Sequence, residues 1–209
     1  MIRPPGFAGA AFGTVHTGDL RADEARRLQV SGELGLSSEW AFVTQVHSAN
    51  VLTADKPGNL GEADAIITSQ TGLPIAVATA DCVPIILEAS QAVAVVHAGW
   101  RGAAAGVVTE TLATMERLGY PAVRAAIGPA IGPCCYEVGT EVVDRFPGFV
   151  ATTTWGTPSV DIPRFVAGQL SNLEVWQSDK CTFTSETLHS WRRNRTKQRQ
   201  VAVAWLPKT

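Results

Sequence analysis

Short apolar runs with strand-like spacing dominate the first half of the chain, and helix-like patterns appear between later runs. We predict strands at these positions: 40–46, 50–53, 64–68, 75–79, 84–87, 92–96, 123–127 and 201–205. We predict helices over 23–34 before Gly35, over 103–118 before Gly119, over 136–146, and after Asp161, which caps a first turn containing Pro163. This order of elements indicates an α+β fold with mixed sheets. Because no linker or repeat is visible, residues 1–209 are expected to form a single domain.

The composition narrows the function classes. Of 209 residues, 45% are hydrophobic and 17% are charged, as in a folded globular protein, and the net charge is -2. A general binder of nucleic acid or anionic membrane is usually basic, so neither partner is expected. No apolar run approaches the roughly 20 residues of a membrane helix, and Met1 to Ala10 does not resemble a secretory signal. Four cysteines are too few for a disulfide scaffold, so a cytoplasmic protein with reduced thiols is expected.

Cys82 and His97 flank two predicted strands that are joined by a short turn. If Ala89-Ser90 is the centre of that turn, His97 stands opposite Cys82 in the hairpin. Directly opposed residues of an antiparallel pair point to the same face, about 4.5–5.5 Å apart. The register therefore brings a thiol next to an imidazole. Pro84 predicts that the first of these strands is an edge strand or is bulged.

His47, at the end of another predicted strand, is a candidate third ligand. Two imidazoles and one thiolate suit Zn²⁺, and three protein ligands leave one position open, as in catalytic zinc sites. Two alternatives remain open. Cys82 and His97 can form a nucleophile pair oriented by Asp81, or the histidines can be ordinary polar residues and Cys82 a small buried apolar one. Asp81 can also orient a histidine ligand or lie in a turn.

A candidate anion site follows His97. Gly99 begins a glycine turn that leads into a predicted helix, and helix starts offer free N–H groups to anions. Arg101 adds a forked donor for phosphate, with Gly102 beside it. A basic run near the end of the chain includes Arg192 and Arg193 and is either a further phosphate contact or a solvated loop. The remaining cysteines, Cys134, Cys135 and Cys181, are interpreted as structural thiols.

Several motifs, in this order, resemble one family. They are Gln45-Val-His47, Asp64-Ala65, Thr79-Ala-Asp-Cys-Val-Pro84, His97-Ala-Gly-Trp-Arg-Gly102, Ile127-Gly-Pro-Ala-Ile-Gly132, Tyr136-Glu-Val-Gly139 and Ser190-Trp-Arg-Arg193. The family is known as laccase-domain or polyphenol oxidase proteins, and also as purine nucleoside phosphorylases or peptidoglycan editing factors. The resemblance covers roughly residues 40–205.

The resemblance implies a fold in α/β/β/α layers and a metal held by residues that correspond to His47, Cys82 and His97. It implies phosphorolysis of adenosine, inosine and methylthioadenosine, and in some members deamination of adenosine. A copper-based polyphenol oxidase activity and a role in correcting cell-wall precursors are the other functions attached to the family. Either a monomer or a homodimer is compatible with the sequence.

Three observations refine what the resemblance implies. The chain has four histidines in all, too few for the histidine-rich cluster of a multicopper oxidase, so zinc is preferred to copper. Asp81 is a candidate general acid for the leaving purine. The segment before residue 40 is short for the family, Ala25-Arg26 replaces a usual Asn-Arg, and Thr196-Lys-Gln-Arg199 replaces a usual Thr-Gly-Arg. These departing segments are expected to line the substrate pocket.

Overall fold

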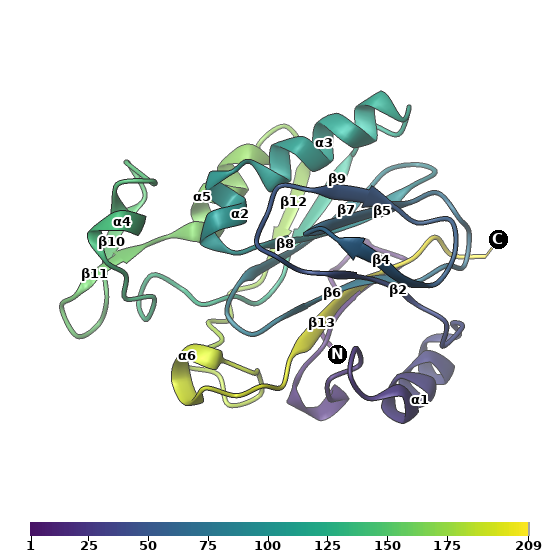
Figure 1. Cartoon of the computed structure of the whole chain (residues 1–209), viewed down its shortest axis with the longest axis horizontal. Coiled ribbons are helices and arrows are strands. Elements are labelled where there is room, and N and C mark those ends of the chain that lie inside the picture. Colours follow the sequence, from purple (N-terminus) through teal and green to yellow (C-terminus); the bar gives the residue numbers. More distant parts are fainter. Residues whose placement is uncertain (209) are drawn as a thin grey trace.

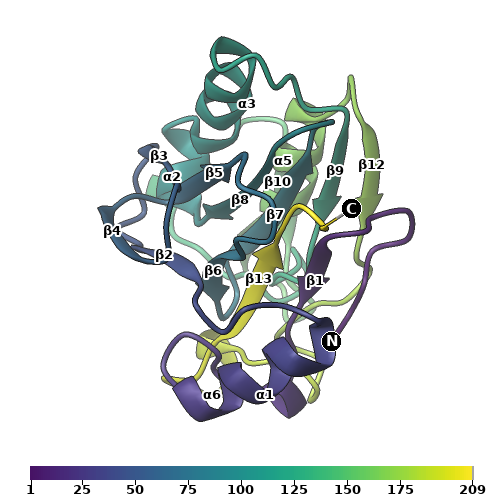
Figure 2. The same ribbon diagram turned by 90° about the vertical axis from the view of Figure 1, so that its right-hand side faces the viewer.

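The computed structural model describes residues 1–208 and has an α+β fold with two mixed sheets packed face to face. Helices cover the outer face of each sheet (Figures 1 and 2). Along the described chain, no helix has both the length and the apolar character needed to cross a bilayer. The predicted fold class is therefore confirmed, as is the mixed character of its sheets.

The first sheet has five strands in the order β1-β13-β6-β2-β4. These are β1 (Ala10–Phe12), β13 (Gln200–Ala204), β6 (Ile75–Thr79), β2 (Ala41–Thr44) and β4 (Gly58–Glu62). The second sheet has six strands in the order β12-β9-β7-β8-β5-β3. These are β12 (Glu174–Gln177), β9 (Arg124–Ile127), β7 (Val83–Glu88), β8 (Val93–Ala98), β5 (Ala65–Thr68) and β3 (Val51–Thr53). A separate hairpin pairs β10 (Val150–Thr152) with β11 (Pro158–Val160) and projects from one end of the molecule (Figure 1).

The helices lie on opposite sides of the two sheets. Above the second sheet are α2 (Trp100–Ala104), α3 (Val107–Arg117) and α5 (Ile162–Gln169), and below the first sheet is α1 (Glu24–Leu34) (Figure 2). The short elements η1 (Val15–Thr17), α4 (Thr140–Val143) and α6 (Trp191–Asn194) complete the chain.

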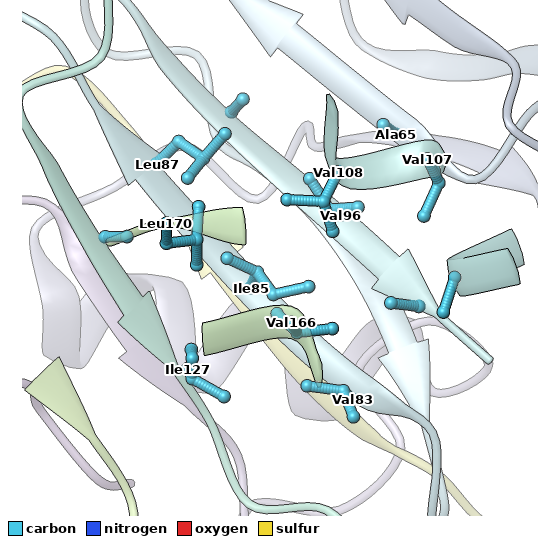
Figure 3. Close-up of a cluster of buried hydrophobic side chains, with 14 of the residues drawn as sticks. Ala65, Val83, Ile85, Leu87, Val96, Val107, Val108, Ile127, Val166 and Leu170 are labelled. Atoms are coloured by element: carbon cyan, nitrogen blue, oxygen red, sulfur yellow. The ribbon is translucent and has the colours of Figure 1, made fainter. Parts of the chain in front are cut away.

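Alternation along the strands produces three apolar layers. On β8, Val95 points between the two sheets, whereas Val96 packs toward the helices (Figure 3). On β6, Val77 points between the sheets, whereas Ala76 packs toward the side of α1. Because side chains of a strand alternate between faces, strands that are buried on both faces read as continuous apolar runs. This explains why the sequence pattern located β5 to β8 well.

The register predicted for the β7–β8 hairpin was wrong by two residues. The N–H of Ala89 donates to the carbonyl of Ala92, so the turn is centred on Ser90-Gln91, and His97 pairs with Pro84 rather than with Cys82. A shift of two residues keeps the same faces, so the thiol and the imidazole still lie on one side of the sheet.

Pro84 lies neither on an edge strand nor at a bulge, which corrects a second prediction. Strand β7 is flanked by β8 and β9. The carbonyl of Pro84 accepts from the N–H of Gly128, just beyond the end of β9, so the missing proline N–H falls where that ladder ends.

Two predicted helices also differ. The helix expected over 103–118 is divided into α2 and α3 by Gly106, whose φ of 87° no helix accommodates. The helix expected over 136–146 is reduced to α4, because Glu137 bridges Ser159 and Val138 bonds to Pro158 in extended backbone. By contrast, α1 ends before Gly35 and α5 is capped by Asp161, as predicted.

Candidate metal centre

The structure brings His47, Cys82 and His97 together, with one ligand atom from each within 4.8 Å of the others. Cys82 precedes β7, His97 lies near the end of β8, and His47 follows β2 in the other sheet. The Cys82 sulfur is 3.9 Å from Nε2 of His47, and the two imidazole rings meet edge to face with centroids 4.9 Å apart. Side chains from both sheets therefore converge at one point.

Asp64, directly before β5, holds this arrangement in place. Its fully buried carboxylate accepts from Nδ1 of His97 at 2.7 Å and from the N–H of His47 at 3.0 Å. It also accepts from the N–H of Val46 and from the N–H and hydroxyl of Ser48. These bonds fix the His47 backbone at a φ of 61° and leave Nε2 of His97 as that ring's free nitrogen.

Charge interactions inside the group favour a thiolate beside an imidazolium. Burial alone raises the pKa of Cys82, but the neighbouring His97 and His47 outweigh it and lower that pKa to about 6. Burial alone lowers the pKa of His97, but the Cys82 thiolate and Asp64 raise it to about 9. Burial raises the pKa of Asp64, whereas its bonds from His97 and Ser48 lower it to about 2.

Glycine is required where α2 begins against the group. A Cβ on Gly99 would lie 2.6 Å from a ring carbon of His47 and 3.1 Å from the Cys82 sulfur. A Cβ on Gly102 would lie 2.9 Å from the carbonyl oxygen of Ser48. Gly102, predicted to bind phosphate, is buried and allows α2 to pack on the His47 loop.

A cavity of about 500 Å³ opens over the group and is ringed by arginines. Arg101 extends beside the ring of Trp100, with its guanidinium carbon 4.2 Å from the ring centroid. The lining residues with charged or aromatic side chains are Arg21, His47, Asp81, His97, Trp100, Arg101, Tyr136, Trp191, Arg192 and Arg199. The lining contains four arginines and one carboxylate, so the cavity suits an anion.

Of the two arginines predicted near the end of the chain, only Arg192 lines the cavity. Its guanidinium lies 5.1 Å from the Tyr136 ring centroid. The guanidinium of Arg193 instead donates to four backbone carbonyls, those of Thr182, Phe183, Ser185 and Leu188. Arg193 thus holds its own loop together, which corrects its predicted role in substrate binding.

Asp81 is buried and both of its carboxylate oxygens are engaged. Oδ1 accepts from the hydroxyl of Thr182 at 2.7 Å, and Oδ2 accepts from the N–H of Arg192 at 2.6 Å. Among residues 1–208, the histidine whose ring bonds to a carboxylate is His97, and its partner is Asp64 rather than Asp81. The geometry therefore favours a role in anchoring the loop of Arg192 over the predicted role as a proton donor.

Sequence reasoning gave no role to several residues at this site. Asp64, Gln45 and Tyr136 belong to the motifs that resemble the family. Their presence in those motifs was the available signal, but it did not indicate what each residue does. The Gln45 amide exchanges two 2.8 Å bonds with the backbone of Ala78 and ties the two strand ends together. Burial, followed by the neighbouring Cys82, raises the pKa of Tyr136 to about 12, so its hydroxyl remains a donor.

Only some residues of the segments that differ from the family pattern line the cavity, although both segments were expected to do so. Arg199, from the unusual Thr196–Arg199 stretch, lines the cavity. Ala25 and Arg26 lie on α1, and Arg26 instead donates to the carbonyls of His16 and Thr17. Arg21, in the loop before α1, is the residue of this region that reaches the cavity.

Comparison with known proteins gives a consistent family. A purine nucleoside phosphorylase of Corynebacterium glutamicum is 36% identical over 99% of this chain and 92% of its own length. Another from Streptomyces griseus is 36% identical over 96% of this chain and 90% of its own length. The crystal structure of YlmD from Geobacillus stearothermophilus superposes with a TM-score of 0.86 at 28% identity, covering 100% of this chain and 98% of that one. The family described as multi-copper polyphenol oxidoreductase laccase matches residues 5–207, and the chain belongs to it.

Proposed function

We propose that this chain is a zinc-dependent enzyme that cleaves purine nucleosides with phosphate, releasing the base and ribose-1-phosphate. Adenosine, inosine and methylthioadenosine are the proposed substrates. The observation that carries the proposal is the position of an open two-histidine, one-cysteine group in a cavity ringed by arginines. Relatives named purine nucleoside phosphorylase, at 34–36% identity, support it.

The residues fit zinc on their chemistry and spacing. A sulfur and an imidazole nitrogen on one tetrahedral zinc are about 3.6 Å apart, and Sγ of Cys82 and Nε2 of His47 are 3.9 Å apart. Asp64 orients His97 through Nδ1, as carboxylates do for histidine ligands. When bound there, zinc would supply positive charge and Lewis acidity beside the substrate. Copper is less favoured because His16 and His189 lie outside both groups of potential ligands among residues 1–208.

The arginines are assigned to phosphate. Arg101 lines the cavity together with Arg21, Arg192 and Arg199, so the lining carries four positive charges. In phosphorolysis, a phosphate oxygen bonds to the anomeric carbon while the bond from that carbon to the purine nitrogen breaks. The electron pair leaves with the purine, which takes up a proton. Holding phosphate in line with that bond is the main contribution of the arginines.

Aromatic side chains are assigned to the nucleoside. Trp100, Tyr136 and Trp191 line the same cavity as the arginines and offer flat apolar surfaces to a purine ring. Because its pKa is raised to about 12, the Tyr136 hydroxyl keeps its proton at neutral pH and is available to donate to a bound nucleoside. Asp81 cannot readily serve as the acid, because both of its oxygens already accept bonds.

One observation favours a second candidate function. Asp64, His97 and Cys82 also form a carboxylate–imidazole–thiol series, as in a cysteine hydrolase. His47 discriminates between the two, because a hydrolase needs no second imidazole beside its thiolate. In a hydrolase, His47→Ala retains turnover and zinc inhibits it. In the proposed enzyme, His47→Ala removes both zinc and turnover.

Product analysis tests the proposal. Zinc-loaded protein is incubated with adenosine or inosine, with and without phosphate, and the products are separated by chromatography. We expect release of the base together with ribose-1-phosphate, only when phosphate is present. Ammonia release without phosphate would indicate deamination instead. If zinc-replete protein yields neither product, the nucleoside assignment is wrong.

A further inference from the structure

A second group of potential metal ligands lies away from the cavity. The sulfurs of Cys134, Cys135 and Cys181 all lie within 4.8 Å of one another. All three thiols are free. The sulfurs of Cys134 and Cys135 are 3.2 Å apart, well beyond the roughly 2.05 Å of a disulfide bond.

The fold brings these cysteines together from two distant segments. Cys134 and Cys135 lie in a turn in which the N–H of Cys135 donates to the carbonyl of Gly132. Cys181 reaches them through a parallel bridge to Ala130, and the N–H of Thr182 donates to the Ala130 carbonyl at 3.0 Å. The convergence therefore depends on tertiary pairing and not on sequence spacing.

One sulfur already accepts a backbone hydrogen bond. The N–H of Gly132 donates to Sγ of Cys181 at 3.2 Å. N–H donors to sulfur are a feature of metal–thiolate centres, where they stabilise the negative sulfur and tune its metal. The site is also accessible, since Cys134 and Cys181 line a solvent-open hollow of about 360 Å³.

We propose that Cys134, Cys135 and Cys181 bind a thiophilic d¹⁰ cation such as Zn²⁺. Two sulfurs on one tetrahedral zinc are about 3.8 Å apart. The sulfurs of Cys134 and Cys135 are 3.2 Å apart, and all three sulfurs lie within 4.8 Å of one another, so small side-chain shifts bring them to that spacing. Three thiolates leave a fourth position on the side of the hollow, where water completes the coordination. On binding, the three thiols release their protons to solvent and no electron is transferred.

The position of this site gives it a structural consequence for the cavity. Ile131, next to Gly132, donates its N–H to the carbonyl of Asp81, and Thr182, next to Cys181, donates its hydroxyl to the Asp81 carboxylate. A cation at the three cysteines would therefore clamp the two segments that hold Asp81, the residue before Cys82. The three-cysteine site positions the cavity without contacting the substrate.

Zinc stoichiometry of the intact chain tests this proposal separately from the proposed function. After reduction and zinc loading, native mass spectrometry should find about two zinc ions on the wild-type chain and about one on His47→Ala/Cys82→Ala. Adding Cys181→Ser to that variant should remove the remaining ion. Because only the first two substitutions touch the histidine centre, a failed nucleoside assay leaves these results unaffected.

A second measurement does not depend on the folding of the Cys181→Ser variant. In His47→Ala/Cys82→Ala, added Cd²⁺ should produce a thiolate charge-transfer band, and zinc should protect all three remaining cysteines from alkylation. Absence of bound zinc in that variant would overturn the proposal. So would zinc retained after Cys181→Ser, or a mass two hydrogens lower that reports a disulfide among the three cysteines.

Discussion

Asp64→Asn is the most informative single change to the proposed centre. The wild-type carboxylate accepts five hydrogen bonds, from Nδ1 of His97, from the N–H groups of Val46, His47 and Ser48, and from the Ser48 hydroxyl. An asparagine keeps one oxygen and turns an NH₂ group toward the donors that faced the other. At least two donors then lose their acceptor around a fully buried side chain.

The magnitude follows from that loss. A buried N–H without an acceptor costs about 1–3 kcal/mol, so two of them lower the free energy of unfolding by about 2–6 kcal/mol. Because His97 loses the partner that fixes its tautomer and His47 loses its backbone anchor, zinc affinity should fall about 10–100-fold. Competition with a chromophoric chelator measures the affinity, and thermal unfolding of the zinc-free protein measures the stability.

Asp19→Asn is the matched control. Asp19 is also a buried carboxylate that accepts from backbone N–H groups, those of Arg21, Ala22 and Arg199, but it touches no proposed ligand. The Asp19→Asn variant should be less stable than the wild-type protein but should bind zinc with the same affinity. If Asp64→Asn and Asp19→Asn bind zinc equally well, Asp64 does not orient the centre and the argument built on it is wrong.

Three further predictions concern the same cavity and its support. Gly99→Ala places a Cβ 2.6 Å from a ring carbon of His47 and should abolish zinc binding. Gly168→Ala is the control, because a Cβ there has no neighbour within 4 Å, and equal zinc content in the two variants would contradict the steric argument. Arg101→Ala should raise the KM for phosphate about tenfold or more with normal zinc content, because a charged bidentate contact contributes about 1.5–3 kcal/mol. Arg117→Ala, which removes an exposed ion pair, is its control, and an unchanged KM in the first variant would refute the assignment. Since the pKa of Asp64 is lowered from 3.8 to about 2, its contribution of about 2 kcal/mol is present above pH 4 and is lost as the pH falls toward 2. Acid titration of zinc-free Asp64→Asn should lack that loss, and identical acid profiles would count against the prediction.

Local signals in the sequence were sufficient for parts of the fold. Asp161 and Pro163 mark the start of α5, and Gly35 marks the end of α1, because caps are written in a few adjacent residues. Strand β12 was missed, because its mostly exposed residues carry no apolar pattern and its position depends on parallel pairing with β9. The hairpin register failed for a related reason, since no residue in the turn dictates which pair closes it.

In the candidate site, too, residues on neighbouring strands could be placed from the sequence, whereas residues brought in by tertiary structure could not. Cys82 and His97 share a hairpin, so an argument from neighbouring strands brought them to one face despite the register error. His47 approaches from the other sheet on a backbone at a φ of 61°, held by a carboxylate that precedes a different strand. The residues alone offered His47 only as a candidate third ligand, and the family resemblance then supported it. Arg193 was misassigned because a basic run does not reveal that backbone carbonyls occupy its guanidinium.

Anomalous diffraction at the zinc edge, from crystals soaked in phosphate, tests the central claim most directly. We expect a zinc peak bonded to Nε2 of His47, Sγ of Cys82 and Nε2 of His97, at about 2.0–2.3 Å from each. Phosphate should lie in the same cavity against Arg101. A centre without metal after zinc loading, a peak that appears only at the copper edge, or phosphate bound elsewhere would contradict the account.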